Sequence, residues 1–330
     1  MGAVKMWLLV TAYVLDRIVG DPDHWRHPVR LIGKIIVFLE KMLYRDGLSP
    51  PQLLFRGGVM MVLVLGFTAA ATVGFLSLLM TFHPIAGQLG SIYLAFTTLS
   101  SKSLADAAKN VAEPLKHKNV ASARKELGKI VGRDTQELDE SAIVRGAVES
   151  VSENFSDGVV APLFYLALGG VPMALMYKAV NTLDSMVGFK NRRYQYFGRP
   201  SARIDDAMNW IPARISAWLL LVASVAGGEG IKQAYSILRR DARSHSSPNS
   251  GYPEAAMAGI LGIQLGGPSY YLGELVEKPF IGDHKITPDP DHIDRATQLM
   301  LSSTILGLFM AVMVWLIKKG VVGCMAATFI

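Results

Sequence analysis

The sequence has very little cysteine and little charge. Its single cysteine, Cys324, excludes an intrachain disulfide and a metal site built from several cysteines. Charged residues make up only 18% of the 330 residues, apolar residues make up 51%, and the mean hydropathy is +0.30. This composition is more apolar than that of ordinary soluble domains. We therefore expect a membrane protein.

Several catalytic and nucleotide-binding motifs are also absent. The chain has neither GxxxxGK[ST] nor GxGxxG, so any nucleotide must be held by another kind of phosphate site. It lacks the GxSxG motif that would favour one class of hydrolase. It also lacks HExxH, and a histidine pair without further ligands is a weak metal site.

Long apolar stretches predict membrane helices. Residues 57–101 contain no Asp, Glu, Lys or Arg, and because a crossing needs about 20 apolar residues, they predict a hairpin that turns at His83-Pro84. Residues 4–19, 210–226 and 299–317 are further candidate spans, and 159–180 and 255–275 are apolar but interrupted by Gly and Pro. The first of these lacks a cleavage site, so we expect a retained helix. We predict an all-α, polytopic integral membrane protein with five to seven membrane segments, some of them re-entrant or broken helices.

The basic residues predict the orientation. They gather on both sides of the 57–101 hairpin, which places both flanks in the cytoplasm and the His83-Pro84 turn outside. A full crossing by residues 159–180 would place the next basic cluster outside, so a re-entrant pair broken at Gly169-Gly170 is favoured. Such breaks are tolerated where the backbone lines a cavity or is buried in protein. No basic stripe alternates with aromatics, so we expect no nucleic-acid partner.

Five parts follow from these patterns. Residues 1–56 form an N-terminal membrane helix with an interfacial loop and helix, and 57–101 form the transmembrane hairpin. Residues 102–157 form a cytoplasmic amphipathic helical region, with breaks near Pro114 and at residues 132–134 and a helix that Asp139 or Ser141 starts. Residues 158–254 form a catalytic core at the membrane interface. Residues 255–330 contain an apolar segment, a polar loop and the last membrane helix.

The first group of candidate site residues has helical spacing. Arg145, Glu149, Glu153 and Asp157 recur every four residues and so share one helix face. A solvated charged face is one interpretation. The other is functional, because the face runs into the apolar segment at the membrane interface. Glu153, Asn154 and Asp157 offer hard oxygen ligands that suit Mg²⁺, with a nucleotide's phosphates completing the shell.

Other candidates lie on both sides of this group. Lys178, Asn181 and Asp184 fall at three-residue steps, and Asp205, Asp206 and Asn209 form a second acidic cluster that suits a metal or an amine, with Arg214 beyond it. Alternatively, Lys178 snorkels to the interface and Asp205 or Asp206 caps a helix. Residues 21–30 hold Asp21, His27, Arg26 and Arg30, and we expect an ordered interfacial loop whose arginines contact phosphate. Lys102 faces the same compartment.

These segments resemble a known family. The blocks are DRIVGDPDHWRHPVRLIG, VGRDTQELDESAIVRGAVESVSENFSDGVVAPLFY, YKAVNTLDSMVGFKNRRYQYFG and SARIDDAMNWIPAR. Together they resemble the adenosylcobinamide-phosphate synthase family of cobalamin biosynthesis, from about residue 16 to 214 and more loosely to Glu254. The likeness is slight after Leu275.

The resemblance implies a multi-pass enzyme of the cell membrane with a cytoplasmic active site. It implies a carbon–nitrogen ligase that uses ATP and Mg²⁺ to join aminopropanol phosphate, or a related amino alcohol phosphate, to adenosylcobyric acid. Forming an amide requires an activated carboxylate and stabilisation of negative charge by a metal and cations. The implied partners are the corrinoid and amino alcohol phosphate substrates, the lipid bilayer and other cobalamin-assembly enzymes.

The resemblance also suggests individual roles. Mg²⁺ would be held by Glu153, Asn154 and Asp157. The ATP phosphates would be bound by Arg133, Lys178 and Arg145. The phosphate of the amino alcohol would be bound by Arg193, Arg203 and Arg214. Asp184 or Asp205 would accept the amine's proton. The remaining substrate-binding candidates are Asp21, His27, Arg30, Lys102, Asn181, Asp206 and Asn209. All of these groups are expected to converge on one pocket.

Two other functions remain open. NxxD at 181–184 and DDxxN at 205–209 are similar to metal-bound pyrophosphate sites of intramembrane prenyl or phospho-alcohol transferases, which would act without ATP. A transporter or scaffold would place the broken helices along a path and form no covalent product.

Overall fold

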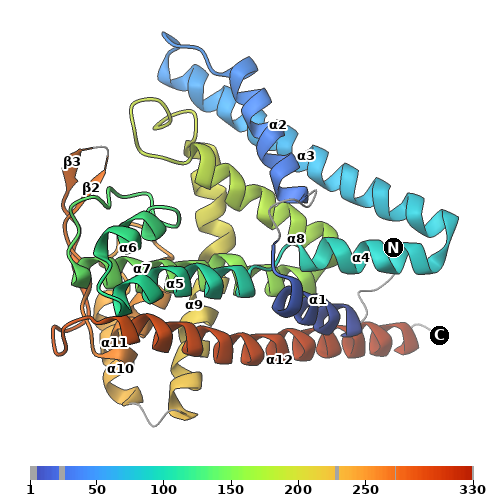
Figure 1. Cartoon of the computed structure of the whole chain (residues 1–330). Coiled ribbons are helices and arrows are strands. Elements are labelled where there is room, and N and C mark those ends of the chain that lie inside the picture. Colours follow the sequence, from blue (N-terminus) through green and yellow to red (C-terminus); the bar gives the residue numbers. More distant parts are fainter. Residues whose placement is uncertain (1–5, 22–26, 227–229, 272, 329–330) are drawn as a thin grey trace. The chain divides into compact units, whose positions relative to one another are not determined.

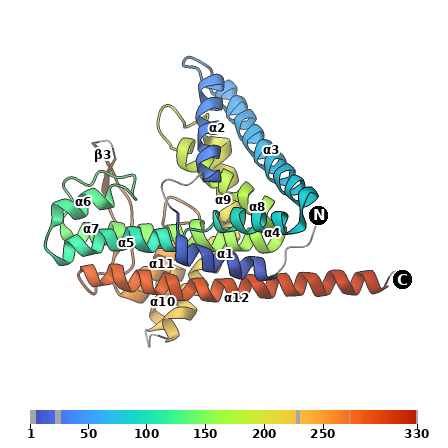
Figure 2. The ribbon, with the colours of Figure 1, turned by 45° about the vertical axis from the view of Figure 1, so that its right-hand side comes forward.

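The computed structural model describes residues 6–21, 27–226, 230–271 and 273–328, which are mostly helical (Figures 1 and 2). The α-helices are α1 (Met6–Val19), α2 (Pro28–Leu43), α3 (Pro50–Phe82), α4 (Pro84–Phe96), α5 (Ser101–Lys116), α6 (Val120–Leu127), α7 (Glu140–Phe155), α8 (Ala161–Val187), α9 (Arg199–Ala226), α10 (Ile231–Asp241), α11 (Gly251–Leu261) and α12 (Pro290–Thr328). A π-helical turn, η1 (Ser156–Val160), joins α7 to α8. Four short strands are β1 (Leu265–Gly266), β2 (Ser269–Tyr271), β3 (Glu274–Val276) and β4 (Phe280–Ile281).

The described helices confirm an all-α polytopic membrane protein. Four stretches are long and apolar enough to cross a bilayer, namely residues 50–82, 140–187, 199–225 and 290–317. This is fewer than the five to seven segments predicted. The predicted span at 4–19 begins outside the described residues, and α1 has 14 residues. The hairpin turns at His83 as predicted, yet α4 has only 13 residues, fewer than the about 20 of a full crossing.

The apolar stretch 255–275, which Gly and Pro interrupt, is not among the candidate membrane spans of the described residues. Helix α11 ends at Leu261 because Gly262 takes a left-handed conformation, with φ of 70°, and its N–H bonds back to Ala258. Glycine adopts this conformation without a Cβ penalty, so it commonly ends helices. The chain then continues into β1, which pairs antiparallel with β4, and into the β2–β3 hairpin.

The chain forms two compact units, each described by itself. The first contains residues 1–100, 161–209 and 308–330, and the second contains residues 101–160 and 210–307. One boundary lies directly before α5, and the other three fall inside continuous helical segments, between η1 and α8 and within α9 and α12.

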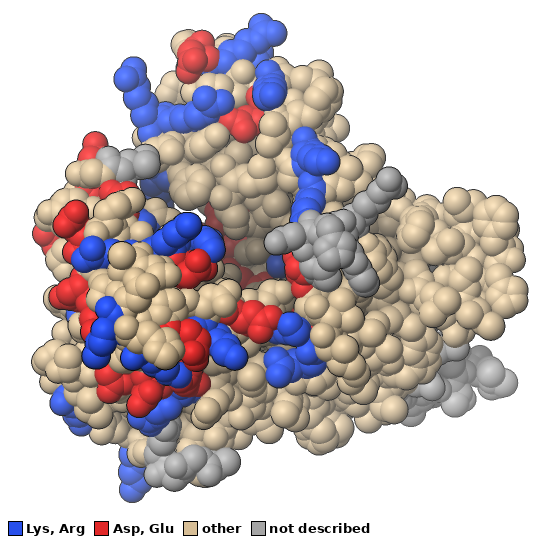
Figure 3. All heavy atoms as spheres, viewed as in Figure 1, with Lys and Arg blue, Asp and Glu red and all other residues tan. Residues whose placement is uncertain are grey.

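The core of the first unit lies between α2, α3 and the second half of α8. Ile36, Met60 and Leu183 are fully buried there. A Cβ on Gly57 of α3 would lie 1.8 Å from the Phe197 carbonyl oxygen, so the close approach of these segments requires glycine at this position. The surface around the α3–α4 turn shows hardly any charged side chain, at the right of Figure 3. This part of the unit suits a hydrocarbon environment.

Helix α8 is broken at Gly170, as the sequence predicted. Gly170 has φ of 71° and ψ of −163°, a combination open essentially only to glycine, and Pro172 follows it. The rings of Tyr165 and Tyr177 stack with centroids 5.1 Å apart. In a straight helix, twelve residues would separate them by about 18 Å. The two halves of α8 therefore fold back on each other.

The second unit surrounds α7. The first predicted break separates α5 from α6, and the second lies in the loop between α6 and α7. Asp139 caps α7 by accepting a hydrogen bond from the Ala142 N–H at 2.7 Å. Helices α10 and α11 pack so closely that a Cβ on Gly259 would lie 2.7 Å from the Cα of Ala234. Asp134 binds the β2–β3 hairpin through the Gly273 N–H at 2.7 Å. The loop before α7 and the β2–β3 hairpin are thus held together beside the polar face of α7.

Candidate active site

Glu149 forms the buried centre of a charged cluster in the second unit. It is 6% exposed, its Oε1 accepts a 2.6 Å hydrogen bond from the Gly266 N–H, and its Oε2 pairs with the guanidinium of Arg133. A buried carboxylate persists only when it is paired and hydrogen-bonded. At this position the solvated-face interpretation of α7 is therefore wrong.

One turn further along α7, Glu153 meets the segment before α11. Its Oε1 accepts a 2.8 Å hydrogen bond from the Ser250 hydroxyl. Glu254 lies on α11 with 4% of its surface exposed, and His245 Nε2 lies 3.8 Å from its Oε1. The His245 Nδ1 lies 3.0 Å from the Ser247 backbone nitrogen, and its Nε2 faces Glu254.

Burial and like charge set the protonation of this cluster. Burial, followed by the carboxylates of Glu149 and Glu153, raises the pKa of Glu254 well above its ordinary value of 4.5. Lys278 and Arg133 act in the opposite direction, but less strongly. Burial likewise lowers the pKa of His245. The cluster therefore combines a carboxyl group whose pKa burial raises with an imidazole whose pKa burial lowers, and such perturbed pairs are common at functional sites.

The predicted magnesium ligands lie at the junction of α7 and η1. Glu153 and Asn154 are exposed, Asp157 is half-buried, and the Asn154 Nδ2 donates to the Ser150 carbonyl at 2.9 Å. Asp157 belongs to the π-helical turn, a rare geometry that is frequent at functional sites. Throughout the described residues no three His, Cys, Asp or Glu side chains gather as a metal site. Two carboxylates and an amide fit the share of the Mg²⁺ shell that proteins usually supply.

The first unit holds a second polar network, between α8 and α9. Tyr177 donates its hydroxyl proton to the Asn209 Oδ1 at 2.8 Å, and the Asn209 Nδ2 donates to the Asp205 Oδ2 at 3.0 Å. The Asp205 Oδ1 is buried without a hydrogen-bond partner among the described residues. Asn181 and Asp184 lie beside Asp205. The predicted neighbours from α8 and α9 therefore do meet.

The capping interpretation of the acidic pair on α9 is wrong. The helix begins at Arg199, so Asp205 and Asp206 lie inside it and not at its N-cap. Asp205 is 8% exposed and Asn209 is 1% exposed. Buried polar groups inside a helix need a reason other than capping, and the α8–α9 network provides one.

His27, Asp21 and Arg30 also come together in the first unit. The His27 Nδ1 caps α2 through the Val29 N–H at 3.3 Å, while its Nε2 lies 3.9 Å from the Asp21 carboxylate. Arg30 approaches the same carboxylate at 3.5 Å. Burial lowers the pKa of His27, and Lys178 is close enough to lower it further. The N-terminal loop and α8 therefore contribute to one region, although Arg26 lies outside the described residues.

The other basic residues predicted for the site differ in their partners and in their exposure. Arg193 pairs with Glu40 at 2.8 Å and lies over the Tyr44 ring, and Lys102 pairs with Asp106 at 2.7 Å. Arg214 lies over the rings of Trp210 and Tyr252, each 4.1 Å from its guanidinium carbon. Arg203 is exposed and Arg145 is half-buried.

The predicted site residues divide between the two units. Arg133, Arg145, Glu153, Asn154, Asp157, Lys102 and Arg214 belong to the second, and Asp21, His27, Arg30, Lys178, Asn181, Asp184, Arg193, Arg203, Asp205, Asp206 and Asn209 belong to the first. The convergence of all of them on one pocket stays a prediction. The sequence reasoning missed His245, Ser250, Glu254 and Lys278 as members of the charged cluster. The only signal was the dense run of polar and turn-forming residues HSSPNSGYPE, at 245–254.

Fold and site together define a polytopic helical membrane protein with buried carboxylate clusters. Comparison with known proteins identifies the family: residues 9–300 match the family model described as CobD/Cbib protein. The chain is 48% identical over 305 residues to the cobalamin biosynthesis protein CbiB of Salmonella paratyphi B, covering 91% of this chain and 95% of that protein. It is 46% identical over 308 residues to the cobalamin biosynthesis protein CobD of Klebsiella pneumoniae, covering 93% and 97%. The chain belongs to the CobD/CbiB family. No solved structure matches it.

Proposed function

We propose that this protein is an ATP-dependent amide ligase of cobalamin biosynthesis. It joins the amine of aminopropanol phosphate, or of a related amino alcohol phosphate, to a carboxylate of adenosylcobyric acid. The observation that carries the proposal is the match to the CobD/CbiB family over residues 9–300. It is supported by 46–48% identity, over nearly the full length, to relatives named for cobalamin biosynthesis. The buried ionisable groups of both units are consistent with it.

The second unit offers the residues for the nucleotide and the metal. Mg²⁺ would be held by Glu153, Asn154 and Asp157, and it would neutralise charge on the phosphates. Arg145 and Arg133 would bind those phosphates. Because Arg133 already pairs with Glu149, it would also fix the orientation of that carboxylate.

The first unit offers the residues for the amine. Amide formation requires the ammonium group to lose a proton before it attacks the activated carboxylate, so a carboxylate must lie near it. Within the part of the chain that the structure describes, one buried oxygen of Asp205 has no hydrogen-bond partner, and Asp184 lies beside it. Either would accept the proton, while Arg193 and Arg203 would hold the amino alcohol's phosphate.

A direct assay tests the function. The purified protein is incubated in detergent or nanodiscs with adenosylcobyric acid, aminopropanol phosphate, ATP and Mg²⁺, and the corrinoid is analysed by mass spectrometry. We expect a product that contains both substrates minus one water, formed only when ATP is present. Product formed without ATP from a diphosphate donor would support the transferase alternative instead. Absence of product with every substrate present would reject the ligase.

A further inference from the structure

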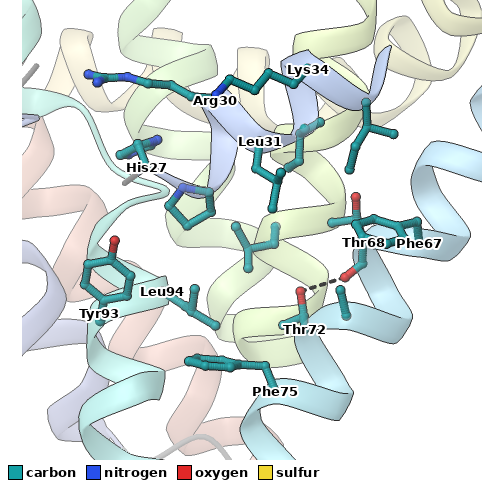
Figure 4. A pocket seen from close by; sticks show the side chains of 15 residues that line it. His27, Arg30, Leu31, Lys34, Phe67, Thr68, Thr72, Phe75, Tyr93 and Leu94 are labelled. Carbon is teal, nitrogen blue, oxygen red and sulfur yellow. Dashed lines mark hydrogen bonds between the residues drawn. The ribbon is translucent and has the colours of Figure 1, made fainter. Parts of the chain in front are cut away.

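The first unit contains a large cavity between α2, α3 and α4, and His27 and Arg30, described above, line its polar end. Its volume is about 840 Å³, and its lining includes Phe67, Ala71 and Phe75 of α3, Leu94 of α4 and Leu175 of α8 (Figure 4). A cavity of this size and lining is typical of a site for a small organic molecule.

Away from the α2 end, the cavity offers a ligand few polar groups, namely the hydroxyls of Thr68, Thr72 and Tyr93. Its two threonines, Thr68 and Thr72, donate their hydroxyl protons to the carbonyl oxygens of Val64 and Thr68, at 2.8 and 2.7 Å. Figure 4 shows the second of these bonds along α3. Because these donors are already used within the helix, the body of the cavity suits an acyl chain.

Positive charge gathers at one end of the cavity. Arg30 and Lys34 lie one turn apart on α2, above the apolar side chains in Figure 4. Asp21 partly neutralises Arg30, but no ion pair to Lys34 is found among the described residues. Burial keeps His27 neutral near pH 7 by lowering its pKa. The end of the cavity therefore has a net positive charge and attracts an anionic group.

One wall of the cavity is formed by a helix that is long and apolar enough to cross a membrane. Helix α3 is one of the four candidate spans, and Phe67 and Phe75 are 50% and 44% exposed. Phospholipid is the most concentrated amphiphile around such a helix. Basic residues at the cytoplasmic end of a membrane helix attract anionic lipids in particular.

We propose that this cavity binds one anionic phospholipid, with an acyl chain along α3 and its phosphate at Arg30 and Lys34. The bound lipid fills the space between α2, α3 and α4 and so stabilises their packing. This inference does not rest on the ligase function. Arg30 is also a substrate-binding candidate, but neither the α7 carboxylates nor the α8–α9 network takes part in the lipid site.

Native mass spectrometry of the full chain released from nanodiscs tests the proposal. The nanodiscs contain equal amounts of phosphatidylglycerol and phosphatidylcholine. We expect one retained lipid per chain, with phosphatidylglycerol strongly preferred. Ala71→Trp fills the cavity and should reduce lipid retention at least tenfold. Ala70→Trp is the matched control, because Ala70 is the exposed neighbour that does not line the cavity, and it should retain lipid.

The head-group contact is tested separately, in variants that keep the cavity open. Lys34→Gln should reduce the preference for phosphatidylglycerol about fivefold, which is the effect expected of one lysine near an anionic surface. Lys41→Gln, on the same helix but outside the cavity lining, should not change it. If Ala71→Trp does not fold, Ala71→Met and Lys34→Gln carry the test.

Three results would overturn the proposal. The wild-type chain could emerge without lipid, the two lipids could be retained equally, or both tryptophan variants could lose lipid to the same extent. Displacement of the lipid by adenosylcobyric acid at equal concentration would instead make the cavity a substrate site. Failure of the ligase assay would leave the lipid result unaffected, so the two proposals fail separately.

Discussion

At the scale of single residues, the buried ion pair between Glu149 and Arg133 is the contact most sensitive to mutation. Removing one partner leaves a buried charge uncompensated, which costs about 3–5 kcal/mol. Glu149→Gln should therefore lower the free energy of unfolding in detergent by at least about 3 kcal/mol. Glu126→Gln is the control, because Glu126 pairs with an exposed lysine, Lys129, and such pairs contribute about 1 kcal/mol or less. Equal losses in the two variants would contradict the buried pair.

The raised pKa of Glu254 predicts a dependence of stability on pH. Above its ordinary value of 4.5 the carboxyl group ionises in the unfolded chain but stays protonated in the folded one, so stability falls as pH rises. Each unit by which the pKa is raised corresponds to about 1.4 kcal/mol. Glu254→Gln cannot ionise, so its melting temperature relative to the wild type should increase between pH 5 and pH 8, measured without Mg²⁺ or ATP. A difference that stays constant with pH would contradict a raised pKa.

Asp157 carries the prediction for the metal. Asp157→Ala removes one of the proposed oxygen ligands, and loss of one group that stabilises developing charge commonly reduces turnover by about a hundredfold or more. We expect at least that loss of ligation, with normal expression and membrane insertion. Asp46→Ala, at an exposed aspartate outside both clusters, should retain activity. Full turnover by the Asp157 variant would remove this residue from the site.

The sequence predicted the helix face of this cluster but not its partners. A spacing of four residues on α7 is visible in the sequence because it is local. Ser250 and Glu254 follow Glu153 by about a hundred residues in the sequence, so their proximity to Glu153 becomes visible only in the folded chain. Likewise, Asp205-Asp206 before an apolar stretch was considered as a helix cap, although α9 begins at Arg199, where Pro200 in the first turn is a signal of a helix start.

At the scale of elements, the break in α8 is the feature that positions Tyr165 against Tyr177. Gly169-Gly170 followed by Pro172 made this break predictable, whereas the exact end of α11 at Leu261 was not predicted, because several Gly and Pro residues interrupt the stretch 255–275 and the sequence does not single out Gly262 among them. A helix break could thus be predicted from the sequence where two glycines and a proline lie close together.

Gly170→Ala tests the break. The observed φ of 71° and ψ of −163° cost a residue with a Cβ about 1–3 kcal/mol, so the variant should be destabilised by that amount. Gly66→Ala is the matched control, because nothing lies within 4 Å of a Cβ there and alanine favours a helix. Thermal unfolding in detergent measures both. A Gly170 variant as stable as the Gly66 variant would mean that α8 continues straight.

At the scale of the whole molecule, the predicted orientation places the loop before α3 in the cytoplasm and the turn after it outside. Single cysteines test this in a Cys324→Ser background, at the exposed positions Asp46 and Thr81. In intact cells a membrane-impermeant maleimide should label Thr81→Cys but not Asp46→Cys, and lysis should expose the latter. Labelling of both in intact cells, or the reverse pattern, would contradict the orientation.

Carboxylate activation by ATP is the central claim, and the path of one oxygen atom tests it most directly. Adenosylcobyric acid labelled with ¹⁸O in the reacting carboxylate is incubated with the protein, ATP, Mg²⁺ and aminopropanol phosphate. Because amide formation removes one carboxylate oxygen, we predict one ¹⁸O per product in inorganic phosphate if the intermediate is an acyl phosphate, or in AMP if it is an adenylate. Amide product without labelled phosphate or AMP would contradict the account.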